Sequence, residues 1–223
     1  MAYNTDLLKR VFDTEPATFF VGPPACGKGT QAMLLVDVYK KVTGLQDIFY
    51  SDSGDRFRER IPKMSERNQK RIADIQASGT LQSWLLASAF WTQKFLDEWE
   101  QGPIIFDGGP RRKEEADAFL ELCRQVSPRK MIAFHLNLSD NEMDIRMIKR
   151  NEELRLKGKS PRSDSATPEG RKKRISEYYE ETIPAIKHFG SETDVIVYEI
   201  DGMQSIDSVH IQIVLSLENY ALR

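Results

Sequence analysis

The chain has 223 residues and a formal charge of -2, because 32 Lys and Arg nearly balance 34 Asp and Glu. This balance gives it no overall attraction to nucleic acid or to an anionic membrane, and 40% hydrophobic with 30% charged residues fits a globular fold. Cys26 and Cys123 are too few and too isolated for a disulfide framework or a structural zinc site. With no apolar run of about 18 residues and no apolar leader, we expect a cytoplasmic protein.

Short apolar runs alternate with helical patterns along the chain. The strands are expected at residues 17–21, 47–50, 104–106, 131–138 and 195–200. The helices are expected at residues 28–42, 65–78, 81–100, 113–125, 140–156, 169–188 and 206–218. This alternation predicts an α/β fold, with a mostly parallel sheet covered by helices on both faces. The first 16 residues are expected to form either a helix packed on the core or a disordered lead-in.

A glycine-rich loop stands between the first strand and the first long helix: Gly22-Pro23-Pro24-Ala25-Cys26-Gly27-Lys28-Gly29-Thr30. Its glycines let main-chain N–H groups turn around phosphate oxygens, and the helix that follows adds the positive end of its dipole. Lys28 is predicted to bind the β and γ phosphates, and the Thr30 hydroxyl to meet Mg²⁺. A plain turn with one exposed lysine is the alternative, but strand, loop and helix together favour a P-loop.

Asp107 follows the predicted strand at 104–106. P-loop proteins use an aspartate in this position to hold a Mg²⁺ shell beside the phosphates. A strand-ending aspartate alone more often caps a turn. Here, however, it opens the segment Asp107-Gly108-Gly109-Pro110-Arg111.

That segment and the Gly-Lys-Gly-Thr form of the loop resemble the adenylate kinase family, short-lid type, and the likeness runs from Phe19 to the last helix. The resemblance implies a P-loop NTPase-type parallel sheet flanked by helices. It also implies a core of residues 1–51, 81–150 and 164–223, an NMP-binding insertion at 52–80 and a short lid at 151–163. The implied activity is reversible transfer of the ATP γ-phosphoryl group, with Mg²⁺, to AMP, giving two ADP for nucleotide biosynthesis.

The resemblance also assigns residues to the acceptor nucleotide. By this likeness Ser53 offers its hydroxyl, Arg58 grips the α-phosphate and Arg111 clamps it. The implied lining of the acceptor site is completed by Thr80, Leu81, Gln82, Gly108, Gly109, Pro110 and Glu115.

On the donor side the resemblance implies that the phosphate loop, Gly22 with Ala25 to Thr30, holds ATP. Arg146 and Arg150 lie four apart on one helix face, and the first is expected to stack on the ATP base. A carbonyl near Gln204 would read that base. Arg162 and Arg174 resemble lid arginines that converge on the transferring group and act with Lys28 and Arg111 in catalysis. Singly, each arginine could belong to a solvated helix face, but two polyphosphates brought together require the set.

Three residues depart from the family pattern. Ala25 replaces a glycine, Gly109 replaces an aromatic residue, and Glu115 replaces a glutamine that reads adenine. A UMP/CMP kinase or another NMP kinase is therefore an alternative, although the Ser53 hydroxyl favours AMP. A nucleotide-binding regulatory protein without transfer activity is another. In each case the partners are small-molecule nucleotides, with no nucleic acid or membrane, and we expect a monomer.

Overall fold

The computed structural model describes residues 3–126 and 130–222. Its centre is one sheet of five parallel strands in the order β2-β3-β1-β4-β5. The strands are β1 (Ala17–Val21), β2 (Phe49–Asp52), β3 (Ile104–Asp107), β4 (Met131–Asn137) and β5 (Val195–Asp201). After β1 the chain forms β2 and β3 on one side of β1 in the sheet, and then β4 and β5 on the other side. The strand order therefore reverses at β1. In parallel α/β sheets, ligands bind beyond the carboxyl ends of the strands at such a point.

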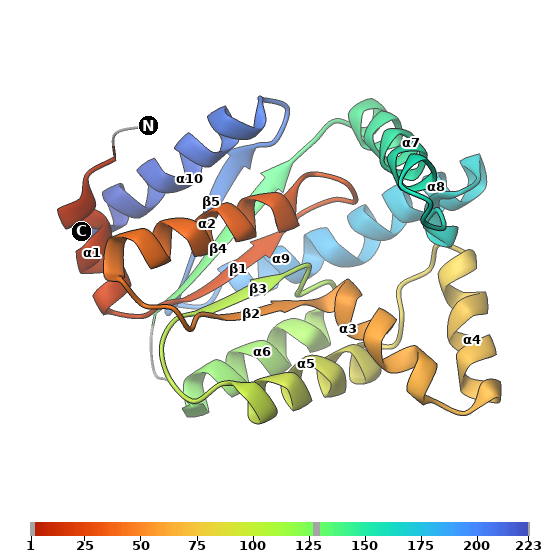
Figure 1. Cartoon of the computed structure of the whole chain (residues 1–223), viewed down its shortest axis with the longest axis horizontal. Coiled ribbons are helices and arrows are strands. Elements are labelled where there is room, and N and C mark those ends of the chain that lie inside the picture. Colours follow the sequence, from red (N-terminus) through yellow and green to blue (C-terminus); the bar gives the residue numbers. More distant parts are fainter. Residues whose placement is uncertain (1–2, 127–129, 223) are drawn as a thin grey trace.

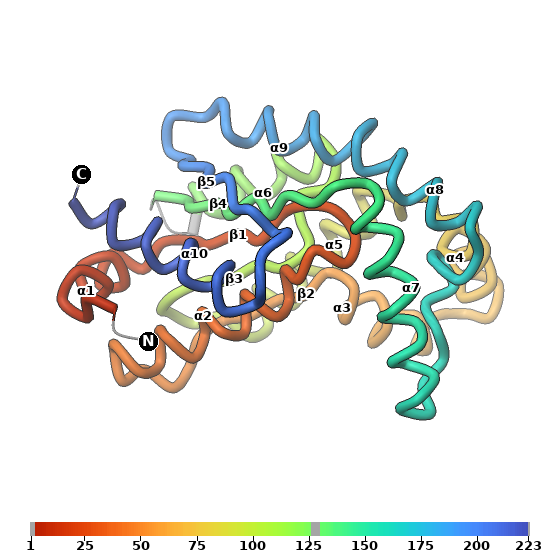
Figure 2. Tube along the Cα trace, turned by 90° about the horizontal axis from the view of Figure 1, so that it is seen from above, coloured from red at the N-terminus to blue at the C-terminus, as the bar shows by residue number. Residues whose placement is uncertain are grey.

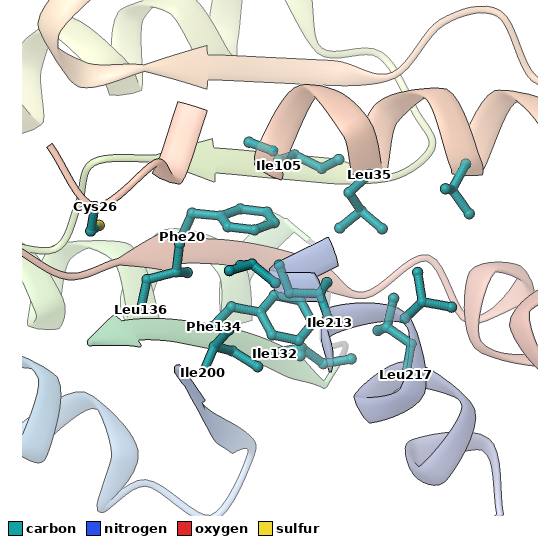
Figure 3. Packing of buried hydrophobic residues seen from close by; sticks show 14 of the residues in the cluster. Phe20, Cys26, Leu35, Ile105, Ile132, Phe134, Leu136, Ile200, Ile213 and Leu217 are labelled. Atoms are coloured by element: carbon teal, nitrogen blue, oxygen red, sulfur yellow. The ribbon is translucent and has the colours of Figure 1, made fainter. Parts of the chain in front are cut away.

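Helices cover both faces of this sheet (Figure 1). On one face lie α1 (Thr5–Asp13), α2 (Lys28–Thr43) and α10 (Ile206–Ala221), and on the other lie α5 (Trp84–Glu98), α6 (Lys113–Val126) and α9 (Ile183–Gly190). Phe20 belongs to the first of two buried clusters (Figure 3), and its neighbour Phe19 belongs to the second. Successive strand residues point to opposite faces, so β1 supplies both clusters. The predicted fold class is confirmed.

The first residues form a helix packed on the core, one of the two arrangements expected for them. Asn4 caps α1 by accepting a hydrogen bond from the Leu7 N–H group. Leu8 and Phe12 are fully buried, and the Phe12 ring stacks on Tyr39 of α2 with centroids 3.6 Å apart. The amino-terminal segment therefore closes the end of the molecule away from the phosphate loop.

Four helices stand beyond the carboxyl ends of the strands, together at one end of the molecule (Figures 1 and 2). They are α3 (Ser53–Arg60), α4 (Glu66–Ala77), α7 (Asp140–Leu156) and α8 (Pro168–Glu177), with short 3₁₀ turns at Ile61–Lys63 and Ser163–Ser165. The predicted insertion at 52–80 coincides with α3 and α4. The predicted lid at 151–163 begins inside α7, because that helix continues to Leu156.

The single helix expected over 169–188 is wrong in one respect. The chain there consists of α8, a π-helical turn at Tyr178–Thr182 and then α9. Pro184 has no N–H group to donate within the helix, and a π turn accommodates this by shifting the hydrogen-bond register, with the Ile183 N–H group donating to the Tyr178 carbonyl. Among the described residues, no helix is long and apolar enough to cross a membrane.

Candidate active site

The phosphate loop leaves β1 after Val21 and enters α2 at Lys28. Gly22 and Gly27 have φ angles of 139° and 94°, which L side chains rarely adopt. A Cβ atom at Gly22 would also collide with the Leu136 carbonyl oxygen, so the loop starts in close contact with β4. The Lys28 ammonium folds back over the loop and donates to the carbonyls of Gly22 at 2.9 Å and Pro23 at 2.7 Å. The loop thus holds a cation at the start of a helix, which is an anion-binding arrangement.

Asp107 ends β3 directly beside this helix start. A Cβ atom on Gly29 would lie 2.8 Å from its Oδ2 atom, so only glycine leaves room for the carboxylate. Tyr50 donates a 3.4 Å hydrogen bond to the same oxygen. Burial raises the pKa of Asp107 to about 7, and Asp52 adds to the rise while Lys28 opposes it. A buried carboxylate with too little positive charge around it has the electrostatics of a cation ligand before its cation arrives.

The oxygen donors here fit Mg²⁺. Thr30 lines the same cavity as Asp107 and Asp52, and these three side chains offer a metal ion one hydroxyl and two carboxylates. The described residues contain no group of three or more His, Cys, Asp or Glu side chains that could hold a metal by themselves. Mg²⁺ does not need such a cage, because it keeps several waters and takes one or two carboxylates together with substrate phosphates.

Arginine side chains from separate elements meet opposite Lys28. Arg150 lies on α7, Arg162 in the loop after it and Arg174 on α8. Burial, together with the neighbouring guanidinium groups, lowers the pKa values of Arg150 and Arg174 to about 10. Burial and Arg58 also lower the pKa of Arg162. Such mutual repulsion between buried cations indicates a site built for a polyanion.

The cavities around these groups adjoin one another. The first lies between α3, the loop before α5 and the segment after β3. The second lies over the phosphate loop, and Arg111, Arg162 and Arg174 line both. A third, between α2, α7 and the start of α10, shares Arg146 and Arg150 with the second. Together the three cavities form an extended space with a cationic centre and two less charged ends. Such a space can hold two nucleotides whose phosphates face each other at the centre.

Most of the predicted acceptor residues line the first cavity. They are Ser53, Arg58, Thr80, Leu81, Gln82, Gly108, Arg111, Glu115, Arg162 and Arg174. The Arg58 guanidinium bonds with Asp55 and is half exposed, so it stands at the rim. Gly109 and Pro110 are buried and do not line it.

The predicted donor residues line the other two cavities. Ala25, Cys26, Gly27, Lys28, Gly29, Thr30, Arg146 and Arg150 line the second, and Gln204 lines the third. Gly22 lies just behind, in a small cavity it shares with Lys28 and Arg174. Arg146 is held by Glu142 at 2.6 Å, and Gln204 donates to Asp201 at 2.9 Å.

Sequence reasoning missed two carboxylates in this cluster. Asp164 bonds with Arg174 and is buried to more than four-fifths, and Asp52 stands at the end of β2 beside Asp107. Asp52 has a weaker form of the signal that identified Asp107, because Ser51 separates it from the expected strand at 47–50. The signal for Asp164 was limited to its position in the sequence between Arg162 and Arg174.

Known proteins resemble this chain over most of its length. The family model for adenylate kinase matches residues 20–194. The adenylate kinase of Hyphomonas neptunium is 31% identical over 200 residues, which are 90% of this chain and 97% of that protein. The adenylate kinase of Maricaulis maris is 30% identical over 197 residues, covering 88% and 96% of the two chains. This chain belongs to the adenylate kinase family.

Membership in the adenylate kinase family confirms the predicted enzyme class, an ATP- and Mg²⁺-dependent nucleoside monophosphate kinase.

The structure shows the surroundings of the residues that depart from the family pattern. Ala25 adopts a φ of 61°, a left-handed conformation that suits glycine better. At Gly109, a Cβ atom would lie 3.1 Å from the Phe119 ring, which stacks on Trp91 at 3.8 Å. An aromatic ring therefore stands beside Gly109, but another part of the chain supplies it.

Glu115 is the third departure from the family pattern. Its side chain is buried, and Oε2 accepts a 2.8 Å hydrogen bond from the Arg111 N–H group. Burial raises the pKa of this carboxyl, although Arg111 opposes the rise. In its ionised form Glu115 only accepts hydrogen bonds and then offers the first cavity no donor.

Proposed function

We propose that this member of the adenylate kinase family transfers the γ-phosphoryl group of MgATP to AMP and forms two ADP. The observation that carries the proposal is the meeting of Arg111, Arg162 and Arg174 opposite Lys28, where the cavities join. ATP would occupy the second and third cavities, with its base between Arg146 and Gln204. AMP would occupy the first, with its phosphate toward Arg111. The transferring group would then lie among the cations.

Transfer needs no side-chain nucleophile. An AMP phosphate oxygen attacks the γ phosphorus, the bond from that phosphorus to the β,γ-bridging oxygen breaks, and the released ADP keeps the bonding electrons. Lys28 would bind the β and γ oxygens, while Arg111, Arg162 and Arg174 would neutralise the equatorial charge. Thr30 and Asp107 would hold Mg²⁺, which when bound supplies positive charge to the phosphates. Catalysis then rests on alignment and charge neutralisation.

We also propose that residues 52–80 are the NMP-binding insertion, that residues 151–163 act as a short lid, and that the remainder is the core. In support, the chain at Gly79 and the backbone at Gly170 of α8 are in close contact, since a Cβ atom on Gly79 would lie 2.8 Å from the Gly170 oxygen. The acceptor-side segment and the helix that carries Arg174 thus touch, and Gly79 and Arg174 line one small cavity with Lys28. Such closure would exclude water and prevent loss of the phosphoryl group to hydrolysis.

A monomer in the cytoplasm is part of the proposal. In support, one chain supplies every side chain assigned to the two nucleotides. The near-neutral composition and the two unpaired cysteines suit a reducing compartment.

The test is ADP formation from ATP with AMP, UMP, CMP and GMP supplied in turn. We expect ADP with AMP at the highest kcat/KM. A preference for UMP or CMP would make the protein a pyrimidine nucleotide kinase. No ADP with any acceptor, while ATP still binds, would indicate a regulatory protein.

A further inference from the structure

A buried polar pair lies directly behind the phosphate loop and has no part in the proposed mechanism. His135 of β4 is paired in register with Val21 of β1, the residue before Gly22. Its ring is 5% exposed, and Nε2 lies 2.8 Å from the hydroxyl oxygen of Tyr178, also buried. On the other side, Nδ1 lies 3.1 Å from Oε1 of Glu199 on β5. The three side chains form a hydrogen-bonded chain from the surface to the floor of the site.

The partners of His135 set the direction of these hydrogen bonds. A carboxylate only accepts, so in the neutral ring the proton sits on Nδ1 and is donated to Glu199. Nε2 is then an acceptor, and the Tyr178 hydroxyl donates to it. Burial raises the pKa of Tyr178 well above its ordinary value, so that hydroxyl keeps its proton. Asn137 donates to the other Glu199 oxygen at 2.6 Å and orients the carboxylate.

Tyr178 connects this chain to the catalytic cations. It is the first residue of the π turn after α8 and follows Arg174 by four positions, so both side chains lie on one face. Together with Lys28 they line a small cavity under the phosphate loop.

The next residue of β4 supports the loop itself. The Leu136 carbonyl contacts Gly22 so closely that no Cβ atom fits between them. Neighbouring residues of β4 thus anchor both sides of the site: Leu136 supports the loop that carries Lys28, and His135 holds the turn next to Arg174.

We propose that His135 and Tyr178 are positioning residues whose hydrogen bond sets the distance between Arg174 and Lys28 during transfer. The inference rests on the proposed function, because it concerns the same phosphoryl group. Neither side chain is assigned to a nucleotide, so its loss leaves the binding surfaces in place. A displacement of Arg174 by a fraction of an ångström weakens transition-state stabilisation more than substrate binding.

The first test is Tyr178→Phe, which removes only the hydroxyl and keeps the buried ring. We expect kcat to fall roughly 5- to 50-fold, with the KM values for ATP and AMP within about twofold of wild type. Tyr179→Phe is the matched control, because the neighbouring hydroxyl donates to Asp140 at 2.6 Å on the exposed side of the helix. Its kcat should stay within about twofold of wild type.

The second test replaces His135. In His135→Gln the side-chain oxygen can reach the Nε2 position and accept from Tyr178, whereas His135→Leu has no acceptor. We expect His135→Gln to retain most of kcat and His135→Leu to match Tyr178→Phe.

Two results would overturn the inference while leaving the proposed function intact: an active wild type with unchanged kcat in Tyr178→Phe, or equal losses in the Gln and Leu variants. A wild type that forms no ADP with any nucleoside monophosphate would overturn both.

Discussion

Asp164 bonds with Nη1 of Arg174, and its negative charge opposes the lowering of the pKa values of the buried Arg150 and Arg162. Arg174 and Asp164 are both buried to more than four-fifths, and the second Asp164 oxygen has no hydrogen-bond partner among the described residues. Asp164 therefore balances a cluster of cations that the proposed substrates would otherwise neutralise.

Replacing Asp164 with Asn should destabilise the substrate-free protein and increase its response to nucleotides. Without the Asp164 carboxylate, the buried charge of Arg174 is uncompensated. A loss of about 2 kcal/mol in the free energy of unfolding would lower Tm by roughly 4–8 °C for a chain of this size. ATP phosphates supply the missing negative charge, so the nucleotide-induced rise in Tm should exceed that of wild type. Thermal unfolding with and without ATP measures both effects. Asp144→Asn removes an ion pair with Arg171 outside the cavities and serves as the control; an equal nucleotide response in the two variants would contradict the interpretation.

Ala25→Gly should stabilise the protein. The left-handed φ of 61° costs an alanine about 1–2 kcal/mol, and glycine adopts it freely while losing more chain entropy. The net gain in the free energy of unfolding should be about 0.5–1 kcal/mol, measured by urea denaturation. Ala73→Gly, at an exposed position inside α4, should instead lose about 1 kcal/mol. A loss in both variants would show that Ala25 is not strained.

The raised pKa of Asp107 predicts how stability varies with pH. Its folded pKa of about 7 exceeds the unfolded value near 4, so the folded protein binds the proton more tightly and its stability is lost as pH rises between these values. Asp107→Asn lacks this proton equilibrium. The free energy of unfolding of the variant, taken relative to that of wild type, should rise by up to about 1.4 kcal/mol per pH unit across that window. Above pH 7 this difference should stay constant. Denaturation of both proteins without Mg²⁺ from pH 5 to 8 measures the difference, and parallel curves would contradict it.

Glu115→Gln should lower the KM for AMP. The glutamine oxygen can accept the Arg111 N–H bond that Glu115 Oε2 accepts now, which leaves an NH₂ group facing the first cavity. One added hydrogen bond to a ring nitrogen of adenine is worth about 0.5–1.5 kcal/mol, or roughly 2- to 10-fold in KM. Steady-state kinetics with varied AMP measures it. Glu114→Gln, on the exposed side of α6, should change nothing; an unchanged or higher KM in Glu115→Gln would mean that Glu115 does not face the base.

The parts of the fold that sequence predicted are those whose signals are local. The β1 run at Ala17–Val21 and the glycines of the phosphate loop each depend on neighbouring residues, and the structure has them where expected. Helix α3 was missed because it lacks the local signal that marks the other helices. Only Arg56 and Phe57 are buried there, so no apolar periodicity marks it. Its start is marked instead by Asp52, which caps the helix.

Features that depend on distant contacts could not be predicted. Phe119 lies ten residues after Gly109 and fills the space beside it, which only the folded chain reveals. The pairing of Asp164 with Arg174 needs the bend between α7 and α8. The contact of His135 with Tyr178 joins a strand to a π turn 43 residues later. In each case the residue types were visible and their partners were not.

The most direct test of the central claim, that Lys28 and the arginines form one phosphoryl-transfer site, is ADP formation from ATP and AMP by wild type and by Lys28→Met. Within residues 3–126 and 130–222, the Lys28 ammonium bonds only with groups of its own loop, Gly22, Pro23 and Cys26, so its removal should leave Tm within a few degrees of wild type. We expect a kcat below about 1% of wild type in a folded variant. A folded Lys28→Met protein with near-normal turnover would contradict it.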